Sequence, residues 1–211
     1  MKRIFNIILL ALFCTSFAQA QEDELLYEDS KDPAPQDVVV RTSSEKVQKD
    51  TFEFTYKGQT LKYEVANGNE AKVSKQQSAK ISGDVKIPER VKFAGKKYTV
   101  TSIGKFAFEY CKGLTSVTIP NSVTSIEGFA FSHCYRLTSI IIPNSVTSIG
   151  GFAFSRCSGL TSVTIPNSVT TIETGSFKDC FHLTSVTIPN SVTAIGDVAF
   201  YFCYSLTSVT I

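Results

Sequence analysis

Residues 103–125 read IGKFAFEYCKGLTSVTIPNSVTS, and residues 126–148 repeat this stretch closely as IEGFAFSHCYRLTSIIIPNSVTS. The spacing of 23 residues continues to the end of the sequence, through four full copies and the first 17 residues of a fifth. The copies are marked by Ile103, Ile126, Ile149, Ile172 and Ile195, by Phe108, Phe131, Phe154, Phe177 and Phe200, and by Cys111, Cys134, Cys157, Cys180 and Cys203. Copies in register over this length predict one structural unit that stacks on itself.

Each copy carries two signals for extended chain and one for a tight turn. Residues 114–119 read LTSVTI, are rich in β-branched residues and stop at Pro120, which predicts a strand with Val117 facing inward. Residues 123–126 predict a second short strand. Residues 106–111 lack β-branched residues, and we expect one short helical or 3₁₀ turn there. The few apolar side chains of one copy cannot offset the entropy of ordering 23 residues, so neighbouring copies must complete the fold.

The order L-x-x-V-x-I-P, then V-x-x-I, then A-F-x-x-C resembles the BspA-like leucine-rich repeats of bacterial surface proteins. The resemblance is close over residues 103–211 and looser over residues 81–102. It implies a β-rich leucine-rich-repeat solenoid, a right-handed superhelix of 23-residue coils with short strands and short turns. It also implies an exported adhesin, because members of this group act as adhesins and some bind host fibronectin or fibrinogen.

Three segments precede the repeats. Residues 1–20 combine a basic start, an apolar run and Ala18-Gln19-Ala20, which predicts a signal peptide and export. Residues 21–50 predict a flexible acidic leader. Residues 51–102 predict an N-terminal cap with a degenerate first coil, because residues 52–65 alternate around a Lys57-Gly58 turn like a β-hairpin. Nine extra residues around Gly95 predict a second small hairpin inserted into that coil, and no later segment is apolar enough to span a membrane.

The net charge and its distribution indicate which classes of partner the protein can bind. The formal net charge is only +2, and residues 103–211 carry five acids and five bases. Affinity for nucleic acid comes mainly from clustered Lys and Arg, so the repeats are not predicted to bind nucleic acid. Residues 51–102 carry ten bases against five acids, a bias that we interpret as a solubilising face.

The repeated cysteines and asparagines predict structural ladders. Stacking would place equivalent cysteines about 4.8 Å apart, within disulfide range, but an odd number at a core position favours buried free thiols. Asn121, Asn144, Asn167 and Asn190 each follow a proline. Their amides are predicted to bond the backbone of their own or the adjacent coil; the alternative is a solvated turn residue that tolerates left-handed geometry.

The variable positions cluster around each cysteine and predict a stripe along one edge of the stack. Aromatic and Arg side chains are over-represented at binding hot spots, so we expect a partner to bind there. The candidate partner-binding residues are Tyr110, Lys112, His133, Tyr135, Arg136, Arg156, Phe181, His182, Tyr201 and Tyr204. Shielding of the coil edge by the aromatic residues is the alternative interpretation. The Ser/Thr positions of the strands are interpreted as a device for β-propensity and solubility.

No motif predicts catalysis, a metal or a cofactor. His133 and His182 lie beside cysteines but lack a partner at ligand spacing, and we interpret both as surface residues. Glu127 and Glu173 would lie roughly 9.5 Å apart, at the outer edge of the spacing in an inverting glycosidase. Nothing else indicates a sugar cleft, so both are interpreted as solvated turn residues.

The predicted function is therefore that of an exported, non-catalytic protein-interaction module, either an adhesin at the cell surface or a secreted one. The alternatives are a glycan-binding accessory protein and a structural spacer. The sequence stops in the fifth copy without a polar capping segment. We expect either a longer reading frame or end-to-end association through the open coil.

Overall fold

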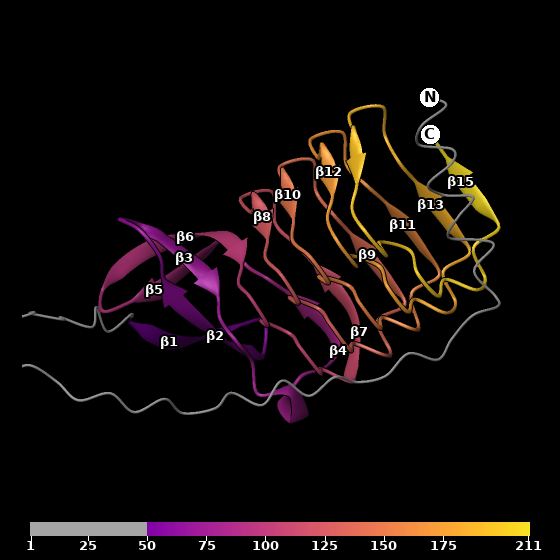
Figure 1. Cartoon of the computed structure of the whole chain (residues 1–211). Helices are drawn as coiled ribbons and strands as arrows, with labels where there is room; N and C mark the ends of the chain where they lie inside the picture. The colour runs from indigo at the N-terminus through magenta and orange to yellow at the C-terminus, as the bar shows by residue number, and fades with distance from the viewer. Residues whose placement is uncertain (1–49) are drawn as a thin grey trace, which may run out of the picture.

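The computed structural model describes residues 50–211, which form a stack of coils lying side by side (Figure 1). The predicted signal peptide and all but the last residue of the predicted leader lie outside the described residues. The strands are β1 (Thr51–Tyr56), β2 (Gln59–Val65), β3 (Glu70–Val73), β4 (Ser82–Lys86), β5 (Arg90–Phe93), β6 (Lys96–Ile103), β7 (Gly113–Thr118), β8 (Ser125–Ile126), β9 (Ser139–Ile141), β10 (Ser148–Ile149), β11 (Ser162–Thr164), β12 (Thr171–Ile172), β13 (Ser185–Thr187), β14 (Ala194–Ile195) and β15 (Ser208–Thr210). One 3₁₀ helix, Ser78–Lys80, completes the described elements.

Within each sheet, equivalent strands of successive repeats pair in parallel, and paired residues are one repeat apart. The two rows of strands are each divided into two sheets, between β9 and β11 and between β10 and β12. Ile126 of β8 pairs with Ile103 of β6 and with Ile149 of β10. In the other row, Val186 of β13 lies between Val163 and Val209. The short strands β8, β10 and β12 line one side of the stack, and β7, β9, β11, β13 and β15 line the other (Figure 1). The predicted β-rich leucine-rich-repeat solenoid is confirmed.

The interior is organised by a column of phenylalanine rings, one from each coil. The centroids of successive rings lie 5.2 to 5.5 Å apart, and their planes are within 6° of parallel. Phe154, in the middle of the column, has no exposed surface. Val117 and Ile119 face inward from their strand, as the alternation predicts. The core is therefore one continuous column that no single coil could bury alone.

The turn between the rows of strands differs from the expected helical turn. The N–H groups of Ala107, Glu109 and Cys111 donate to carbonyls three residues earlier in their own coil. The intervening N–H groups of Phe106, Phe108 and Tyr110 donate instead to carbonyls of the next coil. Phe106 and Tyr110 have positive φ, which a right-handed 3₁₀ or α-helix does not allow. Competition from the next coil thus replaces a helix with linked turns.

Two hairpins with the same turn geometry precede the repeats. β1 pairs antiparallel with β2 through Lys57-Gly58, and β5 pairs with β6 through Ala94-Gly95. All four turn residues have positive φ, as two-residue type I′ hairpins require. β3 joins the first hairpin to the solenoid by pairing antiparallel with β2 and parallel with β6. Both hairpins lie where the sequence predicts them.

The hydrogen-bond ladder expected of the asparagines is made by other residues. Asn121, Asn144, Asn167 and Asn190 are exposed and have negative φ, so neither an amide ladder nor a left-handed turn applies to them. The following serine of each copy donates its hydroxyl to a valine carbonyl one coil earlier. The pairs are Ser122 to Val100 (2.7 Å), Ser145 to Val123 (2.6 Å), Ser168 to Val146 and Ser191 to Val169 (2.9 Å). The predicted asparagine ladder is therefore wrong, because the serine one position later makes the hydrogen bonds between coils.

We expect Ser145→Ala to lower the free energy of unfolding by about 0.5–1.5 kcal/mol, because it leaves a half-buried carbonyl without its donor. Asn144→Ala is the matched control, since it changes the preceding residue of the same turn. Its loss should stay within about 0.5 kcal/mol, as for other exposed positions. Urea unfolding of both variants measures the difference. A larger loss of unfolding free energy in Asn144→Ala would indicate that the asparagines form the ladder.

The five cysteines form a buried ladder of their own. All five are free and buried. In four coils the thiol lies 3.1 to 3.2 Å from the phenylalanine carbonyl of the preceding coil and donates to it. Burial raises the pKa of the Cys111 and Cys203 thiols to about 12, and it raises the pKa of Cys157 well above its usual value. Cys134, Cys157, Cys180 and Cys203 therefore combine packing volume with a weak S–H donor.

Candidate interaction surface

The residue immediately before each cysteine holds a left-handed backbone conformation. These residues, which we call the pre-cysteine row, are Tyr110, His133, Arg156, Asp179 and Phe202, with φ from 59° to 62°. Their geometry follows from the turn, in which the Arg156 N–H donates to the Lys178 carbonyl of the next coil at 2.7 Å. Left-handed φ is unfavourable for bulky L-residues, so backbone preference does not explain why these residue types occupy the row. Such positions are where functional side chains are worth seeking.

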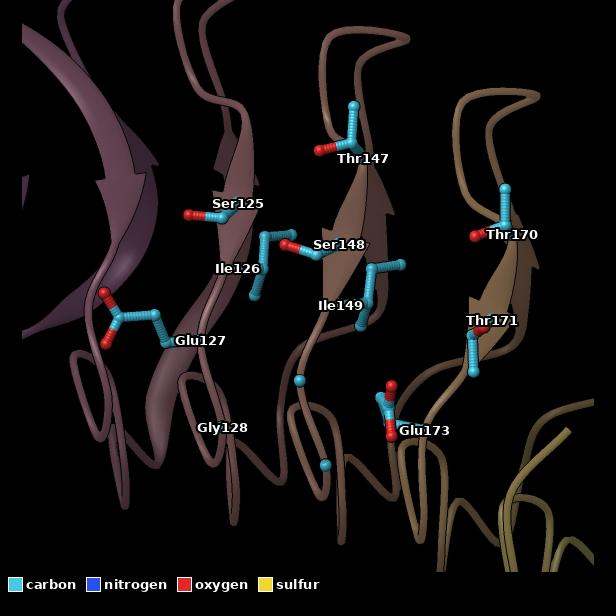
Figure 2. A pocket seen from close by; sticks show the side chains of 12 residues that line it. Ser125, Ile126, Glu127, Gly128, Thr147, Ser148, Ile149, Thr170, Thr171 and Glu173 are labelled. Carbon is cyan, nitrogen blue, oxygen red and sulfur yellow. The ribbon is translucent and has the colours of Figure 1, made fainter. Parts of the chain in front are cut away.

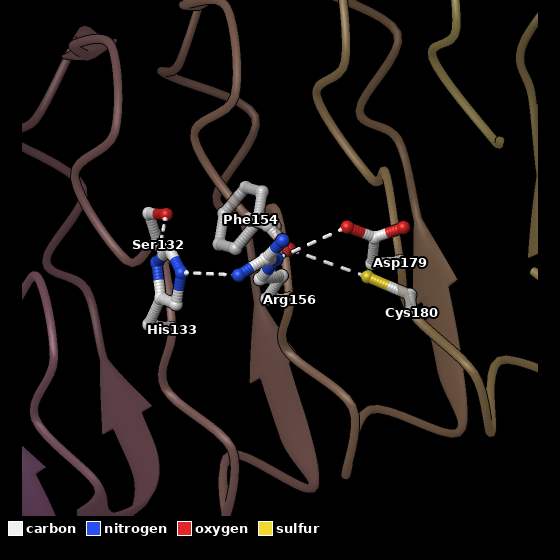
Figure 3. A network of polar contacts seen from close by, with 6 residues as sticks. All are labelled: Ser132, His133, Phe154, Arg156, Asp179 and Cys180. Atoms are coloured by element: carbon white, nitrogen blue, oxygen red, sulfur yellow. Dashed lines mark hydrogen bonds and ion pairs between the residues drawn. The ribbon is translucent and has the colours of Figure 1, made fainter. Parts of the chain in front are cut away.

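Contacts run along the pre-cysteine row from coil to coil (Figure 3). The Tyr110 ring stacks on the His133 ring with centroids 4.2 Å apart. Arg156 Nη1 lies 3.2 Å from His133 Nε2, and Arg156 Nε donates to Asp179 Oδ2, also at 3.2 Å. The Arg156 side chain is 54% exposed, whereas that of Asp179 is only 7% exposed. A buried carboxylate thus holds a guanidinium that still faces solvent.

The Arg156 contact decides the protonation state of His133. A guanidinium can only donate, so His133 Nε2 must accept, and Nδ1–H then donates to Ser132 Oγ at 2.8 Å. Burial, followed by the positive charge of Arg156, lowers the pKa of His133 below its usual value. At neutral pH this imidazole is therefore uncharged, and Arg156 supplies the positive charge of the row.

A second row lies just after the cysteines. Lys112 Nζ lies 5.9 Å from the centroid of the Tyr135 ring. His133 meets the same ring edge-on at 5.8 Å, which joins the two rows. Arg136 follows Tyr135, and both are exposed. The residues joined by these contacts, together with the neighbouring Arg136, form a group that we call the basic–aromatic cluster, consisting of Tyr110, Lys112, His133, Tyr135, Arg136 and Arg156.

The remaining candidate residues form a separate group in the last two coils. Phe181 stacks on Tyr204 at 5.9 Å, and Tyr201 contacts Phe202 at 3.9 Å. His182 bonds the preceding coil, where its Nδ1–H donates to the Ser158 carbonyl at 2.6 Å. The predicted stripe is therefore divided, with Ser158 between the two aromatic groups.

Sequence reasoning missed Asp179. It stands at the same place in the 23-residue period as Tyr110, His133 and Arg156, so the register of the repeat could have identified it. Its role was not visible, because a variable acidic residue normally indicates a solvated position. Only the structure shows that Asp179 is buried and forms an ion pair with Arg156.

Three further phenylalanines form a half-buried row beside the cluster. The Phe106, Phe129 and Phe152 rings stack at 5.3 and 5.1 Å. The row ends on Gly175, where a Cβ atom would come within 2.4 Å of the Phe152 ring. That close approach is open only to glycine, so Phe152 packs onto the next coil. These rings shield the coil edge.

A shallow groove of about 450 Å³ opens on the row of short strands (Figure 2). Ser125, Ser148 and Thr171 supply hydroxyl groups, and Glu127 and Glu173 stand along one side. The Glu127 carboxylate accepts the Lys105 backbone N–H at 2.9 Å, while Glu173 is exposed. Within residues 50–211 no three His, Cys, Asp or Glu side chains gather as a metal site. Among the same residues no helix is long and apolar enough to cross a membrane.

The family follows from the repeat itself. Six copies of the BspA type leucine-rich repeat region match residues 86–211, more than half of the chain. The chain belongs to the BspA-type leucine-rich repeat family. It is 29% identical to the T. pallidum leucine-rich repeat protein TpLRR, with a TM-score of 0.63 over 71% of this chain and 67% of that one. A search of curated proteins gave no match.

A second solved structure shows the same BspA-type architecture. A leucine-rich repeat protein from Eubacterium ventriosum is 28% identical, with a TM-score of 0.62. The match covers 72% of this chain but only 38% of that one. The two similar structures therefore establish the repeat architecture, and the activities of the longer proteins do not transfer with it.

Proposed function

We propose that this BspA-type chain is an exported, non-catalytic protein-interaction module that binds host or bacterial surface proteins. The predicted signal peptide supports export to the cell surface or the medium. Membership of a leucine-rich repeat family supports binding rather than catalysis. Host matrix proteins such as fibronectin and fibrinogen are the first ligands to test, on the strength of the family resemblance.

The basic–aromatic cluster carries this proposal. Tyr110 is 44% exposed and Tyr135 36%, whereas most apolar side chains of the coils are buried. Exposed aromatic rings beside Lys and Arg are the composition of binding hot spots. The rigid turns beneath them reduce the entropy that a partner's binding would cost.

A glycan-binding accessory protein remains the second candidate, because of the groove in Figure 2. Its hydroxyl groups, its two carboxylates and the backbone of its lining residues Gly128, Gly150 and Gly151 could hydrogen-bond a sugar chain. A glycan array run beside immobilised fibronectin and fibrinogen separates the two functions. Binding to glycans alone would favour the groove, and binding to neither would leave the structural spacer.

We expect Lys112→Ala, Tyr135→Ala and Arg136→Ala together to weaken binding of a responding protein at least tenfold, about 1.4 kcal/mol. Arg156 is kept, because its removal would leave the buried Asp179 without its partner. Surface plasmon resonance measures the affinity, and a thermal melt checks the fold.

The control replaces Ser116, Ser139 and Ser162, which lie on strands β7, β9 and β11, with Ala. That variant should bind as the parent does. If the parent and the cluster variant bind the partner with equal affinity, the cluster is not part of the interface. A fall in the melting temperature of the variant would show that the cluster stabilises the fold instead.

A further inference from the structure

The hairpin inserted into the first coil pairs like charges. Lys92 of β5 lies directly across from Lys97 of β6. Arg90 stands two residues before Lys92 and so shares its face, and all three side chains are exposed. Like charges placed opposite each other destabilise a strand pair. The hairpin therefore carries a cost that its own fold does not explain.

The rest of this sheet pairs opposite charges. Glu53 faces Lys62 between β1 and β2, and Glu64 faces Lys72 between β2 and β3. Lys72 Nζ lies 3.6 Å from Glu64 Oε1. Charges on the edge strand β5 also discourage aggregation, but Lys97 lies on the other strand and adds only repulsion there. Within residues 50–211, no ion pair is formed by Arg90, Lys92 or Lys97.

The described chain begins beside this hairpin. Phe52 of β1 stacks on Phe93 of β5 with ring centroids 4.6 Å apart. β1 and β5 accordingly lie together at the same end of the molecule (Figure 1). Asp50, the first described residue, is two positions before Phe52. Whatever precedes Asp50 therefore enters the fold next to the basic hairpin.

The preceding sequence has the complementary charge. Residues 22–37 carry seven acids and one base. The chain between residues 37 and 50 can extend at most about 45 Å, which is ample for reaching a hairpin that starts beside Asp50. We propose that the outward face of the inserted hairpin, formed by Arg90, Lys92 and Lys97, is the docking site of the acidic residues 22–37 of the same chain. The leader then occupies this basic face until it is displaced or removed.

Carbodiimide cross-linking tests the contact in protein that retains residues 21–49. The reagent joins a carboxylate to a lysine amine as an amide, with loss of water, where the two groups touch. Mass spectrometry should find acids of residues 22–37 joined to Lys92 and Lys97 in monomeric chains. Yields should fall about tenfold in 1 M NaCl, where screening acts within about 3 Å. The exposed Lys80 and Lys86 should give background only.

A matched pair of charge reversals gives a second readout. Lys92→Glu with Lys97→Glu should raise the rate at which a glutamyl endopeptidase cuts after Glu24 and Glu28 by about fivefold. Lys80→Glu with Lys86→Glu makes the same change in net charge and should leave that rate unchanged. If the first reversal unfolds the protein, Lys92→Gln with Lys97→Gln replaces it.

Three results would overturn the contact. Equal cleavage rates in both variants would show that the leader does not dock on this face. Cross-links found only in dimers would assign the face to a second copy. The charge reversal at Lys92 and Lys97 could instead leave the cleavage rate of the leader unchanged and abolish binding to phosphatidylglycerol vesicles. That result would assign the basic face to an anionic lipid surface.

Discussion

Phe154→Ala should lower the free energy of unfolding by about 3–5 kcal/mol, the usual loss for a large ring removed from a core. The Phe154 ring has no exposed surface and lies between the Phe131 and Phe177 rings, 5.3 Å from each. Its removal opens a cavity that two rigid coils cannot close, because their spacing is fixed by backbone hydrogen bonds on both sides. Urea unfolding followed by circular dichroism measures the loss.

Phe181→Ala is the matched control for this substitution. It removes the same ring from the following coil, but Phe181 is 40% exposed and, among residues 50–211, its ring stacks on that of Tyr204 alone. We expect it to cost no more than about 1 kcal/mol. Similar losses in the two variants would contradict a single central column as the source of stability.

The repeat allowed the column and the strand register to be predicted from sequence. Burial selects Phe, Leu, Val and Ile at fixed places, and parallel pairing of identical coils leaves only a 23-residue offset between partners. The hairpins were equally predictable, because alternating residues flank Gly58 in the first hairpin and Gly95 stands at the middle of the inserted segment of the second.

Because the copies repeat the same residues, the sequence could not distinguish the roles of residues that always recur together. Asn144 and Ser145 recur together in every turn, so periodicity alone could not decide which polar side chain reaches the next coil. The turn at residues 106–111 was misjudged for a related reason. Its backbone bonds alternate between its own coil and the next, and local propensity says nothing about a partner 22 residues away.

The candidate surface was predictable in position but not in its contacts. The variable residues around the cysteines were expected to share an edge, and Tyr110, His133 and Arg156 do meet there. The ion pair of the buried Asp179 depends on the length and direction of the Arg156 side chain in the preceding coil. That dependence joins two different residues of neighbouring copies, so no repeat consensus contains it.

The cysteine ladder should be inert in the native protein. We expect almost no reaction with a thiol reagent until denaturant is added, and then five thiols per chain in protein that starts at Gln21. The thiolate is the reactive form, and at pH 8 a pKa of about 12 leaves only about one thiol in ten thousand ionised. Cys111, Cys134, Cys157 and Cys180 have no exposed surface and should react more slowly than Cys203, which is 6% exposed.

Ser162→Cys provides the exposed comparison for this measurement. Ser162 lies on the outer face of β11, so the variant should show one fast-reacting thiol in the native state and six after unfolding. Intact mass after alkylation in denaturant distinguishes free thiols from disulfides. Paired cysteines there would contradict the ladder, because each bridge would withdraw an S–H donor from the phenylalanine carbonyl that it now bonds. Fast reaction of the native parent would instead show that the coils separate readily, and that the turns rather than the core column limit stability.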